Sequence, residues 1–174
     1  MASIAEVNLL APRERLPYRP GVIGIIVNDE GKFLVVQMVT YPKNGWRFPG
    51  GGVELRETPA QALLRELKEE LGTDQFKIVG ESRYLNVYDF PSPEIVQRYN
   101  KGGGRDPAYR GQIQSQFLVQ FTGKLEDIRP NQSEIGKFKW VSREELPGHF
   151  IFPGQWEQAR RVLDELLPDP EVST

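Results

Sequence analysis

The sequence predicts an α/β protein in which helices cover both faces of a mixed central β-sheet. Apolar runs of strand length alternate with amphipathic segments of helix length, and this interleaving is typical of an α/β sandwich. No internal repeat and no second apolar core are recognisable, and 174 residues with 39% hydrophobic content suffice for one domain. We therefore expect a single α/β/α sandwich.

The first third of the chain predicts a hairpin followed by a glycine-rich loop. Residues 21–28 form an apolar run that suits a buried strand. Residues 29–31 read Asp-Glu-Gly and predict a turn, after which residues 32–39 return as the second strand. Residues 41–45 are expected to form a loop, and 46–48 lead into the glycines.

A helix is predicted over residues 58–72. Thr58 can cap its first turn, Pro59 suits the first helical position, and Gly72 suits the end. Between them the apolar positions recur at helical spacing and form one stripe, which consists of Ala60, Leu63, Leu64, Leu67 and Leu71.

The second half predicts further strands and two more helices. Residues 76–87 are expected to form one or two strands, and 113–123 and 137–141 one strand each. Residues 142–145 read Ser-Arg-Glu-Glu, a capping box that is expected to open a short helix. Residues 155–167 predict an amphipathic helix.

The domain is expected to span residues 18–168, between a flexible arm at 1–17 and a tail at 169–174. One long polar insertion, rich in glycine, proline and arginine, interrupts it at 89–112. Loops of this length in compact domains are usually functional or disordered.

The composition argues against several classes of function. A net charge of −2 disfavours an extended nucleic-acid surface but allows binding of a nucleotide or an RNA 5′ end. The chain has no cysteine and only one histidine, His149, so thiolate sites, Ser-His-Asp triads and multi-histidine metal sites are disfavoured, and His149 is expected to be structural. With no P-loop, no apolar run of membrane-spanning length and no signal-like segment, we expect a cytoplasmic protein without a membrane anchor.

Three carboxylates share one arc of the predicted helix. Glu66, Glu69 and Glu70 are three and four positions apart, so they lie on neighbouring parts of one face. A solvated helix face is the alternative, because like charges at this spacing cost only about 0.2–0.5 kcal/mol. An all-oxygen donor set favours Mg²⁺, with Mn²⁺ able to substitute, over zinc. Such an ion can neutralise charge on a phosphoryl oxygen and orient a water for in-line attack.

The glycines and charges around this helix follow the order G-x5-E-x7-R-E-U-x-E-E-x-G, where U is apolar. The seven fixed positions are Gly51, Glu57, Arg65, Glu66, Glu69, Glu70 and Gly72. This pattern resembles the signature of the Nudix hydrolases, which cleave diphosphate linkages attached to a nucleoside. Thr73 departs from it, because the family usually has an aliphatic residue there.

The resemblance implies the Nudix fold and a set of roles. Glu66 and Glu70 would be the core metal ligands, and Glu69 would act on a further ion or its water. Gly50 would contribute its carbonyl oxygen to the metal. Glu57 and Arg65 would orient the glutamates. Glu134 falls where some members carry an extra metal-binding glutamate or general base, and its alternative is a charge on a surface loop.

Motifs outside the signature resemble one branch of the family, the bacterial RNA pyrophosphohydrolases and related dinucleoside polyphosphate hydrolases. They are Tyr18-Arg19-Pro20, Trp46-Arg47-Phe48-Pro49, Tyr88-Asp89-Phe90-Pro91 and the stretch 111–118, GQIQSQFL. This chain departs from that branch at three places. It has Gln116 where the branch has a tryptophan, it has Gly50 where the branch has a glutamine, and it lacks basic residues at 37–39.

The substrate-binding residues that this resemblance suggests are Arg19, Arg47, Tyr88, Arg98, Arg110, Gln112 and Phe152. Arg19 would hold a phosphate, Tyr88 would contact phosphate or base, and Phe152 would stack on a nucleobase, with ordinary packing as the alternative for both aromatic residues. Lys101 and Arg105 add further cations to the insertion. Trp46 and Trp140 are assigned either to the core or to a pocket wall.

The expected function is Mg²⁺-dependent hydrolysis of a nucleoside polyphosphate, with a 5′-triphosphorylated RNA end or a dinucleoside polyphosphate as the leading substrate. A nucleoside diphosphate sugar or a nucleoside triphosphate is the enzymatic alternative. A catalytically silent module that only binds nucleotides is the alternative of another class. Oligomeric state is left open.

Overall fold

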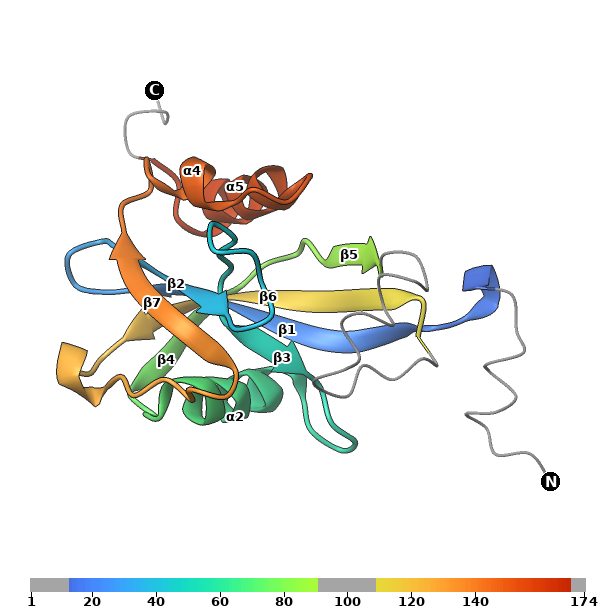
Figure 1. The fold of residues 1–174 in the computed structure, drawn as a ribbon, viewed down its shortest axis with the longest axis horizontal. Helices are drawn as coiled ribbons and strands as arrows, with labels where there is room; N and C mark the ends of the chain where they lie inside the picture. Colours follow the sequence, from blue (N-terminus) through green and yellow to red (C-terminus); the bar gives the residue numbers. More distant parts are fainter. Residues whose placement is uncertain (1–12, 91–108, 170–174) are drawn as a thin grey trace.

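The computed structural model describes residues 13–90 and 109–169, which form one mixed sheet between two layers of helices (Figure 1). The elements are η1 (Arg13–Arg15), β1 (Tyr18–Val27), β2 (Phe33–Met38), β3 (Gly50–Gly52), α2 (Pro59–Leu71), β4 (Phe76–Glu81), β5 (Asn86–Asp89), β6 (Gly111–Phe121), η2 (Leu125–Asp127), β7 (Ile135–Val141), α4 (Leu146–His149) and α5 (Gln155–Leu166). Helix α2 covers one face of the sheet, and α4 and α5 cover the other. The predicted α/β/α sandwich is confirmed.

The seven-stranded sheet has the order β4-β6-β1-β2-β7, with β3 paired to β1 and β5 paired to β6. The β1–β6 pair is parallel and the other pairs are antiparallel, so the sheet is mixed as predicted. Because successive side chains of a strand point to opposite faces, β1 supplies both cores. Val22 and Ile26 pack with Leu63 and Leu67 of α2, whereas Ile25 packs with the cluster under α5.

Helix α2 begins and ends where the sequence predicts. The Thr58 hydroxyl accepts from the Gln61 amide at 3.2 Å, and the Gln61 side chain accepts from the Thr58 amide at 2.9 Å. Gly72 ends the helix in the left-handed region, with φ of 69°. Thr73, the departure from the family pattern, is buried and accepts from the Gln75 amide at 3.2 Å, so its hydroxyl is satisfied.

Several predicted boundaries are wrong. The glycine loop contains a strand, β3, in which Gly50–Gly52 pair with residues 21–23 of β1. A Cβ at Gly50 would lie 2.0 Å from the Val22 carbonyl oxygen, so only glycine allows this close approach. β1 begins at Tyr18, three residues before the predicted strand, and β6 begins at Gly111, two residues before its predicted start.

The remaining differences are small. The segment 76–87 contains two strands, β4 and the first part of β5, which itself extends to Asp89. The ends of the expected insertion therefore belong to the sheet, and its middle, 91–108, lies outside the described residues, as do residues 1–12 of the expected arm. The Ser142–Glu145 segment forms a turn, in which the Glu145 carboxylate accepts from the Ser142 amide at 2.7 Å, and the helix α4 follows it. No helix among the described residues is long and apolar enough to cross a membrane.

Candidate metal and phosphate site

Strand β3 and helix α2 bring two of the predicted acidic residues, Glu66 and Glu70, against the glycine strand. Gly51 lies directly against Glu66, because a Cβ on Gly51 would stand 2.1 Å from the Glu66 carboxyl carbon. The next turn of α2 places Glu70 under Gly50, whose amide donates to Glu70 Oε2 at 3.3 Å. The two carboxylates therefore lie along the glycine strand, where backbone can approach them closely.

Glu70 is a buried carboxylate with an arginine partner. Its side chain is 3% exposed, and Arg47 Nη2 donates to its Oε1 at 2.9 Å. Burial, together with the charges of Glu66 and Glu134, raises the pKa of Glu70 to about 7, although Arg47 and the Gly50 amide act in the opposite direction. A carboxylate that burial and like charges destabilise gains from a nearby cation.

Glu66 has a similar environment. Burial raises its pKa above the ordinary value, Arg65 opposes this by donating to Glu66 Oε1 at 3.0 Å, and the charges of Glu69 and Glu134 add to the increase. The charge of Glu134, a residue distant in the sequence, raises the pKa of both Glu66 and Glu70.

The backbone explains how Glu134 reaches the site. The Asn131 amide donates to the Glu70 carbonyl at 2.8 Å, which ties the turn before β7 to the end of α2. The Glu134 amide donates to the Asn131 carbonyl at 3.0 Å, and its carbonyl accepts from the Val39 amide at 2.8 Å. Two elements therefore fix the position of this turn.

Arg65 holds the acidic residues in place. It donates to Glu57 at 2.6 and 3.1 Å, to Glu66 at 3.0 Å, to Glu69 at 3.2 Å and to the Gly52 carbonyl at 2.9 Å. These bonds raise the pKa of Arg65 and lower that of Glu57, so the pair stays charged. The geometry fits the positioning role expected of Glu57 and Arg65.

The donor set suits a hard divalent cation. Glu66, Glu70, Glu134 and the Gly50 carbonyl offer only oxygen atoms, and like charges among the carboxylates favour a cation between them. In the part of the chain that the structure describes, no three acidic or histidine side chains already converge on one point. Each of the carboxylates of Glu66 and Glu70 forms a salt bridge with an arginine in this structure.

The predicted phosphate-binding and aromatic residues line the sheet beside these carboxylates. Arg19 Nη2 lies over β3, because a Cβ on Gly52 would stand 2.5 Å from it. Gln112 is paired with Arg19 in the β1–β6 register and accepts from the Tyr88 hydroxyl at 2.6 Å. Tyr41 and Tyr88 act electrostatically on Arg47 and contribute to its raised pKa.

Tyr41 is a site residue that the sequence reasoning missed. Its ring meets Phe152 edge-on at 5.1 Å, and Phe152 lies against Gly45 of the same loop. Phe152 is 36% exposed and therefore presents one side of its ring to solvent. The position of Tyr41 just after the second predicted strand was the one available signal.

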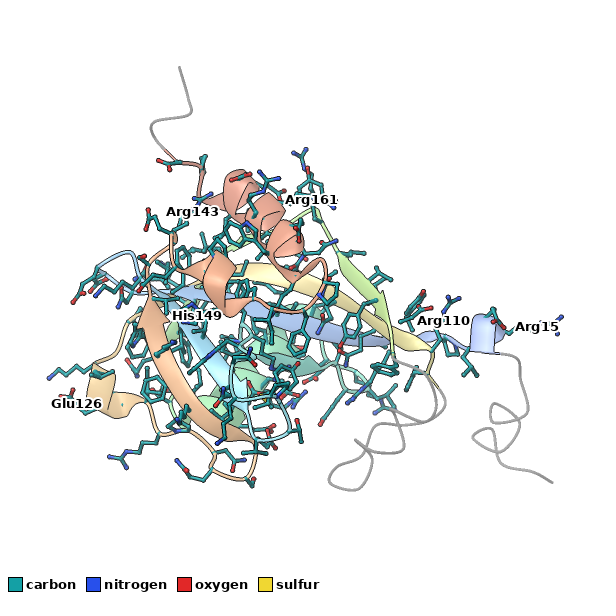
Figure 2. The ribbon with its side chains drawn as sticks, turned by 45° about the horizontal axis from the view of Figure 1, so that its top comes forward. Arg15, Arg110, Glu126, Arg143, His149 and Arg161 are labelled. Carbon is teal, nitrogen blue, oxygen red and sulfur yellow. The ribbon has the colours of Figure 1, made fainter. Side chains whose placement is uncertain are left out.

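Arg110 lies away from this cluster. Its Nη2 donates to Asp89 Oδ2 at 2.8 Å, and its guanidinium stacks on Tyr18 at 4.9 Å. Figure 2 shows Arg110 next to Arg15 at the extended end of the sheet, far from His149. The structure therefore places it in an ion pair at the base of the insertion. Arg98, Lys101 and Arg105 lie outside the described residues.

The aromatic residues left open by the sequence have distinct surroundings. Trp140 packs against the core under α2. Trp46 packs against the other core and lines an open hollow of about 530 Å³ beside β7, where Lys139 rests on its ring at 4.4 Å. His149 Nδ1 lies 2.7 Å from the Glu145 carbonyl, and its ring meets Trp46 edge-on, which is a structural environment.

Comparison with known proteins agrees with this geometry. The family model of the NUDIX domain matches residues 17–166. Proteins named RNA pyrophosphohydrolase from Rickettsia africae and Rickettsia peacockii are each 39% identical over 133 residues, which is 75% of this chain and 79% of theirs.

Solved structures share the fold at lower identity. The E. coli dihydroneopterin triphosphate pyrophosphohydrolase superposes with a TM-score of 0.63 and 19% identity, over 88% of this chain and 99% of its own. An Ap4A hydrolase from C. elegans gives 0.57 and 19%, over 81% and 93%.

The chain belongs to the Nudix hydrolase family, as the match to its domain over residues 17–166 shows. The family resemblance and fold predicted from the sequence are thereby confirmed. Enzymes of this family generally use divalent metal ions, which agrees with the all-oxygen donor set described above.

Proposed function

We propose that this chain is a pyrophosphohydrolase that cleaves a phosphoanhydride bond of a nucleoside polyphosphate, with the 5′-triphosphate end of an RNA as first substrate and a dinucleoside polyphosphate as second. The observation that carries the proposal is the pair of carboxylates along the glycine strand, with buried Glu70 at the Gly50 amide and partly buried Glu66 against Gly51. The relatives named RNA pyrophosphohydrolase support the choice of substrate.

Glu66, Glu70, the Gly50 carbonyl and Glu134 would hold Mg²⁺, with Mn²⁺ as a substitute, and Glu69 lies at the exposed side of this set. The ion, when bound, supplies charge neutralisation at a phosphoryl oxygen and lowers the pKa of a coordinated water. Arg65 and Glu57 would fix the Glu66 carboxylate, and Glu134, whose charge acts on Glu66 and Glu70, would serve as a further ligand or as a base.

The substrate would lie along the edge formed by β3 and the ends of β1 and β6. Arg19 and Arg47 would bind phosphate oxygens, for which a planar guanidinium is well suited. Tyr41, Tyr88 and Phe152 would form the wall against the nucleoside. Gln112 would position Tyr88 through their hydrogen bond of 2.6 Å.

The test is a turnover panel with Mg²⁺ and chromatographic identification of products. It compares triphosphorylated RNA, diadenosine tetraphosphate, adenosine diphosphate ribose, a nucleoside diphosphate sugar and simple nucleoside triphosphates. We expect the first two to be the preferred substrates, with phosphate or pyrophosphate, or a nucleotide, as the second product.

Preference for a sugar nucleotide, with release of a sugar phosphate, would keep the metal site and overturn the proposed substrate. Absence of turnover on every compound, with nucleotide binding retained, would identify a catalytically silent module instead.

A further inference from the structure

Arg47 occupies a cationic position between two of the proposed metal ligands. A single nitrogen, Nη2, donates to Glu70 Oε1 at 2.9 Å and to the Gly50 carbonyl at 3.1 Å. Both acceptors are oxygens of the donor set described above. A guanidinium nitrogen that bridges a carboxylate and a carbonyl therefore stands where a metal ion would share the same two oxygens.

The backbone of Arg47 is fixed, whereas its side chain is only lightly held. Its amide and carbonyl each bond to Val36 at 2.9 Å, and the neighbouring Trp46 carbonyl accepts from Gln155 at 2.7 Å. The hydrogen bonds of the guanidinium within the described part of the chain all come from Nη2, and its buried Nε has no partner there. If Arg47 had only a structural role, its buried Nε would be expected to have a hydrogen-bond partner.

Arg65 provides the contrast within the same site. Its Nε, Nη1 and Nη2 all donate, and they reach Glu57, Glu66 and Glu69 as well as a backbone carbonyl. Displacing Arg65 would break five hydrogen bonds, whereas displacing Arg47 would break two. Of the two arginines, Arg47 is the one that a competing cation can release.

We propose that Arg47 and a divalent ion are alternative partners of Glu70 and the Gly50 carbonyl, and that the ion displaces the guanidinium toward the substrate phosphates. The second part of this inference, in which the guanidinium moves toward the substrate phosphates, rests on the proposed function. Tyr41 and Tyr88, which act electrostatically on Arg47, border the expected path of the substrate. There a phosphate would accept from two of the nitrogens of Arg47, including the Nε that has no partner in the described residues.

The displacement makes metal and substrate binding interdependent. Metal binding must break the two hydrogen bonds of Arg47, and a bound phosphate gives the released guanidinium a new partner. Each ligand therefore strengthens the binding of the other, and by thermodynamic linkage the two effects are equal in size. Removal of Arg47 should strengthen metal binding in the absence of substrate and weaken the coupling between the two.

The experiment is calorimetric titration of the full chain with Mg²⁺, alone and with a methylene-bridged analogue of adenosine triphosphate. The variants are Arg47→Met and Arg47→Gln, with Arg160→Met, an exposed arginine of α5, as the matched control. Glu66→Gln verifies that the titration reports this site. Titration at two pH values above the wild-type pKa of about 7 of Glu70 reveals proton competition, because the Arg47 variants lose the charge that lowers this pKa.

Without analogue, both Arg47 variants are expected to bind Mg²⁺ roughly fivefold or more tightly than the wild type, and Arg160→Met is expected to bind as the wild type does. The analogue should tighten Mg²⁺ binding to the wild type more than to the Arg47 variants. If both Arg47 variants bind Mg²⁺ as the wild type does, or more weakly, Arg47 does not compete with the ion for Glu70. If the analogue tightens Mg²⁺ binding equally in all proteins, the released guanidinium does not bind the substrate phosphates.

Circular dichroism checks that each variant is folded, and the two substitutions at position 47 guard against the failure of one. If the wild type binds Mg²⁺ but no nucleotide analogue, the proposed function fails, while the titration with Mg²⁺ alone still decides the displacement at Glu70.

Discussion

Gly51 and Glu66 are in such close contact that a Cβ on Gly51 would stand 2.1 Å from the Glu66 carboxyl carbon and 2.3 Å from its Oε2. The carboxylate of a helix residue therefore rests on the backbone of strand β3. This contact fixes the distance between α2 and the glycine strand at the point where the metal ligands are expected.

Gly51→Ala should push the Glu66 carboxylate away from this position. We expect a loss of kcat/KM of roughly 100-fold, because displacement of a reacting geometry by about 1 Å has effects of this size. Overpacking should also lower the free energy of unfolding by about 1–3 kcal/mol. Gly148→Ala is the matched control, since a Cβ at Gly148 meets nothing within 4 Å. Equal activity of the two variants would contradict the role of this contact.

Arg65→Lys should weaken catalysis without removing a charge. Lysine cannot reproduce the fork that reaches Glu57, Glu66 and the Gly52 carbonyl together. Loss of such a positioning partner typically lowers metal affinity or activity roughly 10- to 100-fold. Steady-state kinetics at several Mg²⁺ concentrations measure the effect, with Lys68→Met on the exposed side of α2 as the control. A change below about twofold would argue against the positioning role.

The stability of the metal-free protein should depend on pH through Glu70. Its folded-state pKa of about 7 lies above the ordinary 4.5, so the folded protein retains a proton between these values that the unfolded chain has lost. The contribution of this proton to the free energy of unfolding is fully present below about pH 4.5 and is lost as the pH rises through about 7. The loss amounts to about 3 kcal/mol.

Urea unfolding in the presence of a chelator, at intervals across this window, measures the effect. Glu70→Gln should lack this part of the slope, whereas Glu69→Gln, whose parent side chain is 58% exposed, should retain it. The raised pKa of Glu66 gives a slope of the same sign in all three proteins, so the comparison rests on the additional slope that Glu70 contributes. Parallel curves for wild type and Glu70→Gln would show that Glu70 is not the titrating group.

The parts of the site that the sequence predicted are those governed by local physics. Thr58, Pro59 and Gly72 act through their own helix ends, and the spacing of Glu66 and Glu70 follows from the helical period, so all could be predicted without tertiary information. The contact between Glu57 and Arg65, by contrast, was expected from the resemblance to the family signature.

The rest depends on pairing across the fold. Three consecutive glycines carry no side-chain pattern, so nothing local shows that Gly50–Gly52 pair with β1 as a strand. The contact between Arg47 and Glu70 joins residues 23 positions apart, and its geometry is set by that pairing. The ion pair of Arg110 could not be predicted either, because its partner Asp89 belongs to a strand that the sequence did not extend far enough.

Phe152→Ala should affect binding more than chemistry. Stacking of a base on an aromatic ring is worth about 1–3 kcal/mol, so KM for a nucleoside polyphosphate should rise roughly five- to 100-fold while kcat changes little. Ile151→Ala, at an exposed neighbour, is the control. A fall in kcat at constant KM would place Phe152 in the positioning of the phosphates instead.

The most direct test of the account is the turnover of a 5′-triphosphorylated oligoribonucleotide with Mg²⁺ by the wild type, Glu66→Gln and Glu70→Gln. The account predicts that the wild type releases phosphate or pyrophosphate and leaves a shortened 5′ end, and that each variant loses at least roughly 100-fold in kcat/KM while remaining folded. Turnover by either variant at the wild-type rate would contradict the claim that Glu66 and Glu70 hold the catalytic ion.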